Sequence, residues 1–137
     1  MKGKILIVDD ESEIRDMLTR HLMFNDYEIL QAGDGREALE VLEENKIDVI
    51  ISDIVMPRMS GVDMLAIISD EYPMTRCIMM TGYVTQMHLL KCMHYHAETV
   101  IYKPIENLQE VDDAVEGAFA SIKRWNDKLK VLKGMKT

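Results

Sequence analysis

Short apolar runs alternate with amphipathic segments along the chain, and this alternation constrains the fold more than any other feature. The apolar runs lie at residues 5–8, 47–51, 77–80 and 99–102, with a weaker one at 27–30. The segments with the apolar spacing of a helix lie at 12–24, 35–45, 62–71, 84–95 and from 107 onward. Strands that alternate with helices pair in parallel, because each helix returns the chain to the start of the next strand. The sequence therefore predicts a single α/β domain, with a parallel sheet covered by helices on both faces.

The first apolar run, KILIVDD at residues 4–10, ends in two adjacent carboxylates. Its four apolar residues are too few for a buried helix and do not alternate with polar ones, which is typical of a central strand buried on both faces. Open α/β sheets bind ligands at the carboxyl ends of their strands. We therefore expect Asp9 and Asp10 to line a site, and Ser12 to be the N-cap of the helix that follows.

Composition and charge indicate which classes of ligand the protein can bind and where in the cell it is expected. Residues 121–137 hold six Lys or Arg and one Asp, a charge of +5 that leaves −13 on residues 1–120 out of the total of −8. An acidic body argues against nucleic acid as a direct ligand. Cys77 and Cys92 have neither disulfide nor metal-site spacing, and no apolar stretch approaches the roughly 18 residues of a membrane span. We expect a cytoplasmic protein with no membrane contact and no targeting segment.

Polar residues also end the other predicted strands. Asp53 ends the run DVIISD, Thr81 ends CIMMT and Lys103 follows VIY. Together with the first pair of aspartates, they bring three carboxylates, one hydroxyl and one ammonium to one edge of the sheet. Clustered carboxylates repel one another unless a cation joins them, and Mg²⁺ suits oxygen ligands without His or Cys. Mg²⁺ is therefore the expected cofactor.

This combination resembles the receiver domain of two-component response regulators, a chemotaxis-regulator-like domain. The resemblance covers about residues 3–123 and rests on four motifs: the aspartate pair at 9–10, DIVMPRMSG at 53–61, TG at 81–82 and KP at 103–104. Each motif is weak alone, but their order, spacing and position at strand ends are specific. The resemblance implies a flavodoxin-like, doubly wound sheet of five parallel strands in the order 2-1-3-4-5, with five helices.

The resemblance also implies a metal site and a phosphoacceptor. Asp53 would accept a phosphoryl group from a histidine kinase or a phosphotransfer protein. Asp10, Asp53 and the carbonyl of Val55 would bind Mg²⁺ directly, and Asp9 would bind it through water. The domain would thus be a regulatory phosphoacceptor of a phosphorelay, and not an enzyme with other substrates.

The remaining positions of the family's site concern the phosphoryl group and its readout. Thr81 would bond one phosphoryl oxygen, Lys103 would pair with another, and a cis peptide bond is expected before Pro104. The chain departs from the family three residues before the lysine, where Val100 replaces the usual Tyr or Phe and Tyr102 lies next to the lysine. Signalling is expected through the surface of the fourth helix, the fifth strand and the fifth helix.

Other functions share parts of this pattern. Haloacid dehalogenase-type phosphatases also combine an Asp nucleophile with Mg²⁺, but they place their two acids two residues apart and need a capping insertion for which this chain has no room. A protein-interaction module that is never phosphorylated is a further alternative, and the complete acidic set argues against it. His88, Cys92 and His96 would share one face of a continuous helix as zinc ligands, although the family usually turns out of its fourth helix near His96.

The last helical segment carries an apolar stripe that outruns the expected domain. Residues 1–123 would form the receiver domain, and residues 124–137 a basic extension of its last helix, reaching about residue 133. The extension would mediate homodimerisation or connect to an output domain, unless it is the frayed end of an ordinary final helix. The stripe repeats at spacings of four and three residues through Val111, Val115, Ala118, Ile122, Trp125, Leu129 and Leu132.

Overall fold

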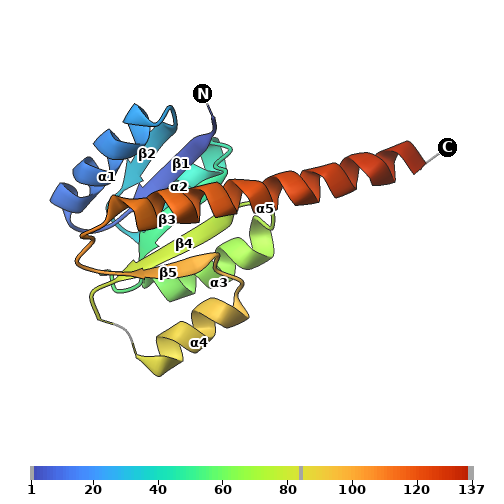
Figure 1. Cartoon of the computed structure of the whole chain (residues 1–137). Coiled ribbons are helices and arrows are strands. Elements are labelled where there is room, and N and C mark those ends of the chain that lie inside the picture. The colour runs from blue at the N-terminus through green and yellow to red at the C-terminus, as the bar shows by residue number, and fades with distance from the viewer. Residues whose placement is uncertain (1, 84, 136–137) are drawn as a thin grey trace.

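The computed structural model describes residues 2–83 and 85–135, and all ten expected elements are present in the expected order (Figure 1). The strands are β1 Lys4–Val8, β2 Glu28–Ala32, β3 Val49–Asp53, β4 Arg76–Thr81 and β5 Thr99–Tyr102. The helices are α1 Ser12–Phe24, α2 Gly35–Glu44, α3 Gly61–Glu71, α4 Gln86–His94 and α5 Leu108–Met135. The predicted alternation of strands and helices is confirmed.

The five strands form one parallel sheet in the order β2-β1-β3-β4-β5, with helices on both faces (Figure 1). Side chains of β1 alternate between two cores. Ile5 and Ile7 pack with α1 and α5, whereas Leu6 and Val8 pack with α2, α3 and α4. All four are fully buried, which explains why this strand is apolar without alternation. The predicted flavodoxin-like α/β fold is confirmed.

The register of the strands determines which residues meet at the carboxyl edge of the sheet. Asp53 at the end of β3 lies opposite Met80 of β4, and Thr81 lies opposite Tyr102 of β5. Lys103 follows directly, so its backbone lies beside the end of β4. The sheet thus gathers the polar residues that end its strands, as predicted.

The start of α1 differs from the prediction. The N-cap position is Glu11, not Ser12, and its side chain makes no capping hydrogen bond. Instead, Asp9 Oδ1 accepts a hydrogen bond from the Glu11 N–H at 2.9 Å. A residue that faces the site therefore also satisfies a backbone donor at the entry to α1, and the serine is left inside the first turn.

Helix α5 is 28 residues long and leaves the sheet part-way along its length (Figure 1). Its buried residues lie between Val111 and Ser121, and every described residue after Ile122 is exposed. The helix ends at Met135, which confirms the prediction that it reaches about residue 133. Although α5 is long, neither it nor any other described helix is apolar enough to cross a membrane.

Candidate functional site

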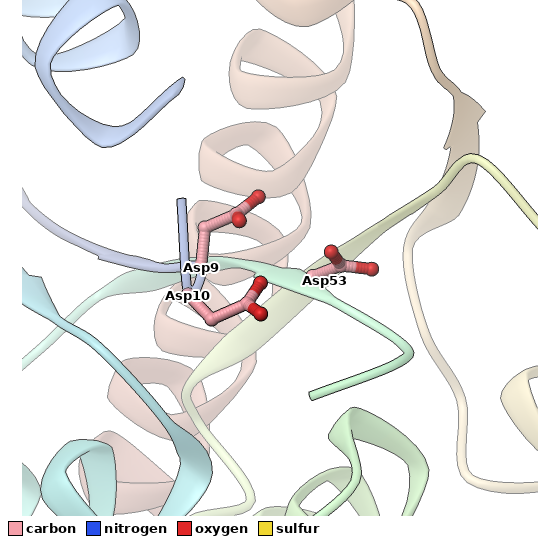
Figure 2. A group of neighbouring side chains, drawn as sticks. All are labelled: Asp9, Asp10 and Asp53. Carbon is pink, nitrogen blue, oxygen red and sulfur yellow. The ribbon is translucent and has the colours of Figure 1, made fainter. Parts of the chain in front are cut away.

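The three predicted carboxylate ligands lie together at the carboxyl edge of the sheet (Figure 2). Asp9 and Asp10 directly follow β1, and Asp53 is the last residue of β3. One oxygen of each side chain lies within 4.8 Å of the oxygens of the other two. Asp9 and Asp53 are buried, whereas Asp10 is exposed. The cluster is therefore open to solvent on the side of Asp10.

Lys103 holds the two buried carboxylates together. Its Nζ lies 2.7 Å from Asp9 Oδ2 and 2.8 Å from Asp53 Oδ2. Burial lowers the pKa of Lys103, but the hydrogen bonds and charges of Asp53 and Asp9 raise it, and the net shift is upward. The amine therefore stays protonated at neutral pH and offsets the repulsion between the two carboxylates.

The charges and donor atoms of this cluster fit a divalent cation. The three carboxylates and the one ammonium carry a formal net charge of −2 within a few ångströms. All the side-chain donors of the acidic group are oxygens, which Mg²⁺ prefers over the nitrogen and sulfur ligands of zinc sites. Asp9, Asp10 and Asp53 could thus hold Mg²⁺, while the carbonyl of Val55 stays a predicted ligand.

Thr81 lies next to Lys103 at the end of β4. Its carbonyl accepts a hydrogen bond from the Lys103 N–H at 2.8 Å, and the peptide bond that follows, Lys103–Pro104, is cis as expected. The buried Thr81 hydroxyl donates to the Tyr83 carbonyl at 2.6 Å and accepts from the Tyr83 N–H at 3.1 Å. A contact between this hydroxyl and a phosphoryl oxygen would require the hydroxyl hydrogen to turn away from that carbonyl.

The loop after β3 fixes the backbone of Asp53. The Val55 N–H donates to Asp53 Oδ1 at 3.2 Å, and the Gly61 N–H donates to the Ile54 carbonyl at 2.8 Å. Gly61 passes so close to Asp53 that an added Cβ would collide with the Asp53 carbonyl oxygen. Ser60 caps α3 with its side chain. The serine–glycine pair of the 53–61 motif is therefore needed to hold the strand end in place.

Two arginines support the site, and the sequence did not single them out. Arg58 Nη1 lies 3.0 Å from Asp34 Oδ2, which ties the loop after β3 to the N-cap of α2. The Arg15 guanidinium donates to the Asp9 carbonyl and so holds the loop after β1. Asp34 before a helical pattern was a recognisable N-cap signal. Its partner was not recognisable, because Arg58 reaches it through a backbone with φ of 68°.

The structure does not form the alternative zinc site. Helix α4 ends at His94, and His96 has a φ of 63°, so the chain turns before His96 could continue the helix. Cys92 is buried in the core below α4. Among the described residues, His88, Cys92 and His96 do not make a group that could hold a metal ion.

Several apolar side chains are exposed on α4 and β5. Met87, Leu90 and Met93 of α4 and Tyr102 of β5 are exposed. Val100, which stands at the family's aromatic position, is half-buried and packs on the core beneath α4. The surface predicted to carry the signal therefore combines these apolar side chains with exposed polar ones such as Lys91 and Thr99, and its aromatic residue Tyr102 precedes Lys103.

Residues 5–116 match the family model of the response regulator receiver domain. The chain belongs to this family. Regulatory protein VanR of Enterococcus faecium is 36% identical over 111 residues, which cover 80% of this chain and 47% of VanR. FleR of Pseudomonas aeruginosa is 30% identical over 106 residues, which cover 77% of this chain and 22% of FleR. The receiver domain thus spans about half or less of the length of these curated relatives.

Solved receiver domains share this fold. The CheY-like receiver domain protein of Methanospirillum hungatei has a TM-score of 0.85 and 27% identity, covering 89% of this chain and 97% of that structure. Response regulator protein TrrA of Thermotoga maritima, solved in complex with Mg²⁺-BeF, has a TM-score of 0.77 and 31% identity, covering 85% of this chain and 98% of TrrA. The protein is a CheY-like receiver domain of a two-component signal transduction system.

Proposed function

We propose that Asp53 accepts a phosphoryl group from a histidine kinase or a phosphotransfer protein, and that this modification switches the contacts of the receiver domain in the cytoplasm. The observation that carries the proposal is the position of Asp53 between a protonated lysine and two further carboxylates. A carboxylate with an adjacent fixed cation and an open, acidic side is suited to receive phosphate with the help of a metal.

The residues of the site supply what phosphoryl transfer needs, which is a nucleophile in line with the leaving group and positive charge on the equatorial oxygens. An oxygen of Asp53 attacks phosphorus as the bond between phosphorus and the donor's nitrogen breaks, and the donor histidine leaves. The Lys103 ammonium moves from the Asp53 carboxylate to a phosphoryl oxygen. The Thr81 hydroxyl turns from the Tyr83 carbonyl to another phosphoryl oxygen.

Bound Mg²⁺ would neutralise the charge of the transferred group. Asp10, Asp53 and the Val55 carbonyl would hold the ion directly, and Asp9 through water. Asp9 suits the indirect role, because its two oxygens already accept hydrogen bonds from the Glu11 N–H and from Lys103. The Mg²⁺-BeF complex of TrrA supports a magnesium site in this fold.

The readout is proposed to be the α4-β5-α5 surface. Lys103 directly follows β5, and Tyr102 is exposed on that strand beside the apolar residues of α4. A change of partner at Lys103 therefore reaches this surface through one residue. The domain acts on its own phosphoryl group as a regulatory switch, and its binding partners recognise the altered surface.

Intact-protein mass spectrometry tests the phosphoacceptor. The wild type, Asp53→Asn and Asp70→Asn are incubated with a small acyl phosphate and Mg²⁺. The wild type and the Asp70→Asn control, which alters an exposed carboxylate of α3, should gain the mass of one phosphoryl group. Asp53→Asn should gain none, because the amide is not a nucleophile. An equal mass gain in Asp53→Asn would assign the phosphate to another residue.

A further inference from the structure

The apolar face of α5 continues beyond the sheet and has no partner within the described residues. Trp125, Leu129 and Leu132 are 60%, 45% and 51% exposed. Their spacings of four and three residues place them on the same side of the helix as Val111 and Ala118, which pack on the sheet. The sheet thus covers the first half of one continuous apolar face of α5, and no described residue packs on its second half.

Two hollows lie where this face leaves the sheet. One, of about 380 Å³, lies between Ile122 and Asn126 of α5 and the loops that follow α2 and α3. The other, of about 400 Å³, is lined by Trp125 together with Pro73 and Tyr95. Both are at the amino-terminal edge of the sheet, opposite the acidic cluster. A helix laid on the exposed face of α5 would therefore reach this edge with one of its ends.

The charge of the amino-terminal edge is opposite to that of the α5 extension. Helices α2 and α3 end there with Glu44 and Glu71, without a basic residue in either last turn, so the negative ends of two helix dipoles add to the carboxylates. Asp48 lies in the adjoining loop together with Lys46, and Arg76 beside the second hollow is paired with Glu98, so these four residues add no net charge and the negative charge of the edge comes from the two helix ends. Residues 123–135 of α5, here called the tail segment, are rich in lysine and include Lys133 near the tip.

We propose that the tail segments of two copies of this chain pair in an antiparallel arrangement, with each tip against the amino-terminal edge of the other copy. Leu129 would lie near the twofold axis, and Trp125 would pack against Leu132 of the second copy. The lysines of each tip would meet the acidic edge of the other copy, which adds electrostatic complementarity to the burial of the apolar face. The pairing does not require phosphorylation of Asp53.

Steric limits exclude a straight parallel pair. Packed helices lie 8–10 Å apart, about the distance that separates a helix from the layer it covers. A parallel partner on the face of Trp125 and Leu129 would run beside the first half of α5 as well. That space is already filled by the sheet, which packs on Val111, Val115 and Ala118. In an antiparallel pair centred on Leu129, the described part of the partner's helix, which reaches Met135, lies beside residues 123–135 and not beside the half of α5 that the sheet covers.

Sedimentation equilibrium of residues 1–137 tests the association. The unphosphorylated wild type should show a monomer–dimer equilibrium. Leu129→Glu should raise the dimer Kd at least tenfold, because it places a charge in the centre of the interface. Val131→Glu is the matched control, since Val131 is similarly exposed but turned by about 100° from Leu132. A wild type that stays monomeric, or equal weakening by both variants, would overturn the proposal.

Cysteine cross-linking tests the orientation. The native Cys77 and Cys92 are buried, so introduced cysteines on the tail segment can be followed in their presence. Asn126→Cys mixed with Lys133→Cys should give a disulfide-linked heterodimer under mild oxidation, because the two positions face each other only in antiparallel pairing. Lys133→Cys alone should not cross-link. A disulfide between two copies of Lys133→Cys, without the mixed product, would show a parallel pair and refute the arrangement.

Discussion

Replacing Asp10 with Asn should make the domain more stable than the wild type in the absence of Mg²⁺ and less stable in its presence. Lys103 bonds the carboxylates of Asp9 and Asp53, so these three groups together carry a charge of −1. Asp10 lies within 4.8 Å of both carboxylates, and the structure gives it no salt bridge of its own among the described residues. The negative charge of Asp10 is therefore repelled by the net charge of −1 on Asp9, Asp53 and Lys103 until a cation binds.

The size of the effect follows from these distances. Two like charges 4.8 Å apart repel by about 1 kcal/mol in water and by about 3.5 kcal/mol at the effective dielectric constant of a protein surface. Because Asp10 is exposed, the lower figure applies, and the free energy of unfolding should rise by about 1 kcal/mol without metal. In a domain of this size, that is an increase in melting temperature of about 3–6 °C.

Mg²⁺ should make the wild type more stable than Asp10→Asn, which reverses their order of stability without metal. At 100 times its Kd, the ion stabilises the wild type by about 2.7 kcal/mol. If the loss of one carboxylate ligand weakens binding by about 100-fold, the same concentration stabilises Asp10→Asn by only about 0.4 kcal/mol. The wild type should then be the more stable protein by about 1 kcal/mol.

Thermal unfolding followed by circular dichroism, in EDTA and in MgCl₂ at matched ionic strength, measures both halves of this prediction. Glu40→Gln, which removes an exposed carboxylate from α2, is the control and should respond to Mg²⁺ as the wild type does. An equal Mg²⁺-induced rise in Asp10→Asn and the wild type would place the ion elsewhere. A variant no more stable than the wild type in EDTA would refute the repulsion between the carboxylates.

Three further outcomes follow from the packing of single residues. Gly61→Ala should lower the free energy of unfolding in urea by about 2 kcal/mol or more, because the added methyl meets a backbone carbonyl. Gly134→Ala, whose methyl lies in open space, should raise the free energy of unfolding by up to about 1 kcal/mol. Equal effects of the two substitutions would contradict the close approach of Gly61 to Asp53. Burial raises the pKa of the Cys77 thiol to about 12, so a thiol reagent should label it slowly near neutral pH and rapidly only after unfolding. Val55 and Tyr83 are 51% and 72% exposed beside the site. An apolar and a bulky aromatic side chain orient an attacking water poorly and hinder its approach, so Val55→Asn combined with Tyr83→Glu should lose phosphate several-fold faster by intact mass. An unchanged lifetime would refute this role.

The alternation of strands and helices and the acidic cluster were predictable because both depend on local patterns, namely apolar runs that end in polar residues. The strand order was predictable only through the resemblance to the receiver domain family. The entry to α1 was not predictable. Ser12 has the residue type of an N-cap, but the side chain that bonds the backbone there is Asp9, because the strand end and Lys103 position its second oxygen toward Glu11. The extent of the sheet's contact with α5 was equally hidden, since the stripe identifies an apolar face without showing that the sheet occupies the first half of that face.

The placement of Lys103 after β5 has a mechanical consequence. β5, like β2, is an edge strand of the described sheet and is hydrogen-bonded to β4 on one side only, whereas β1 and β3 are each held between two neighbours. If the Lys103 ammonium exchanges a carboxylate for a phosphoryl oxygen, as proposed, it would pull on an edge strand, which resists displacement less than a central one. Tyr102, one residue away and exposed, would then move with β5. Under the proposed phosphorylation, β5 would carry the change at the acidic cluster to the surface that partners contact, while the core stays rigid.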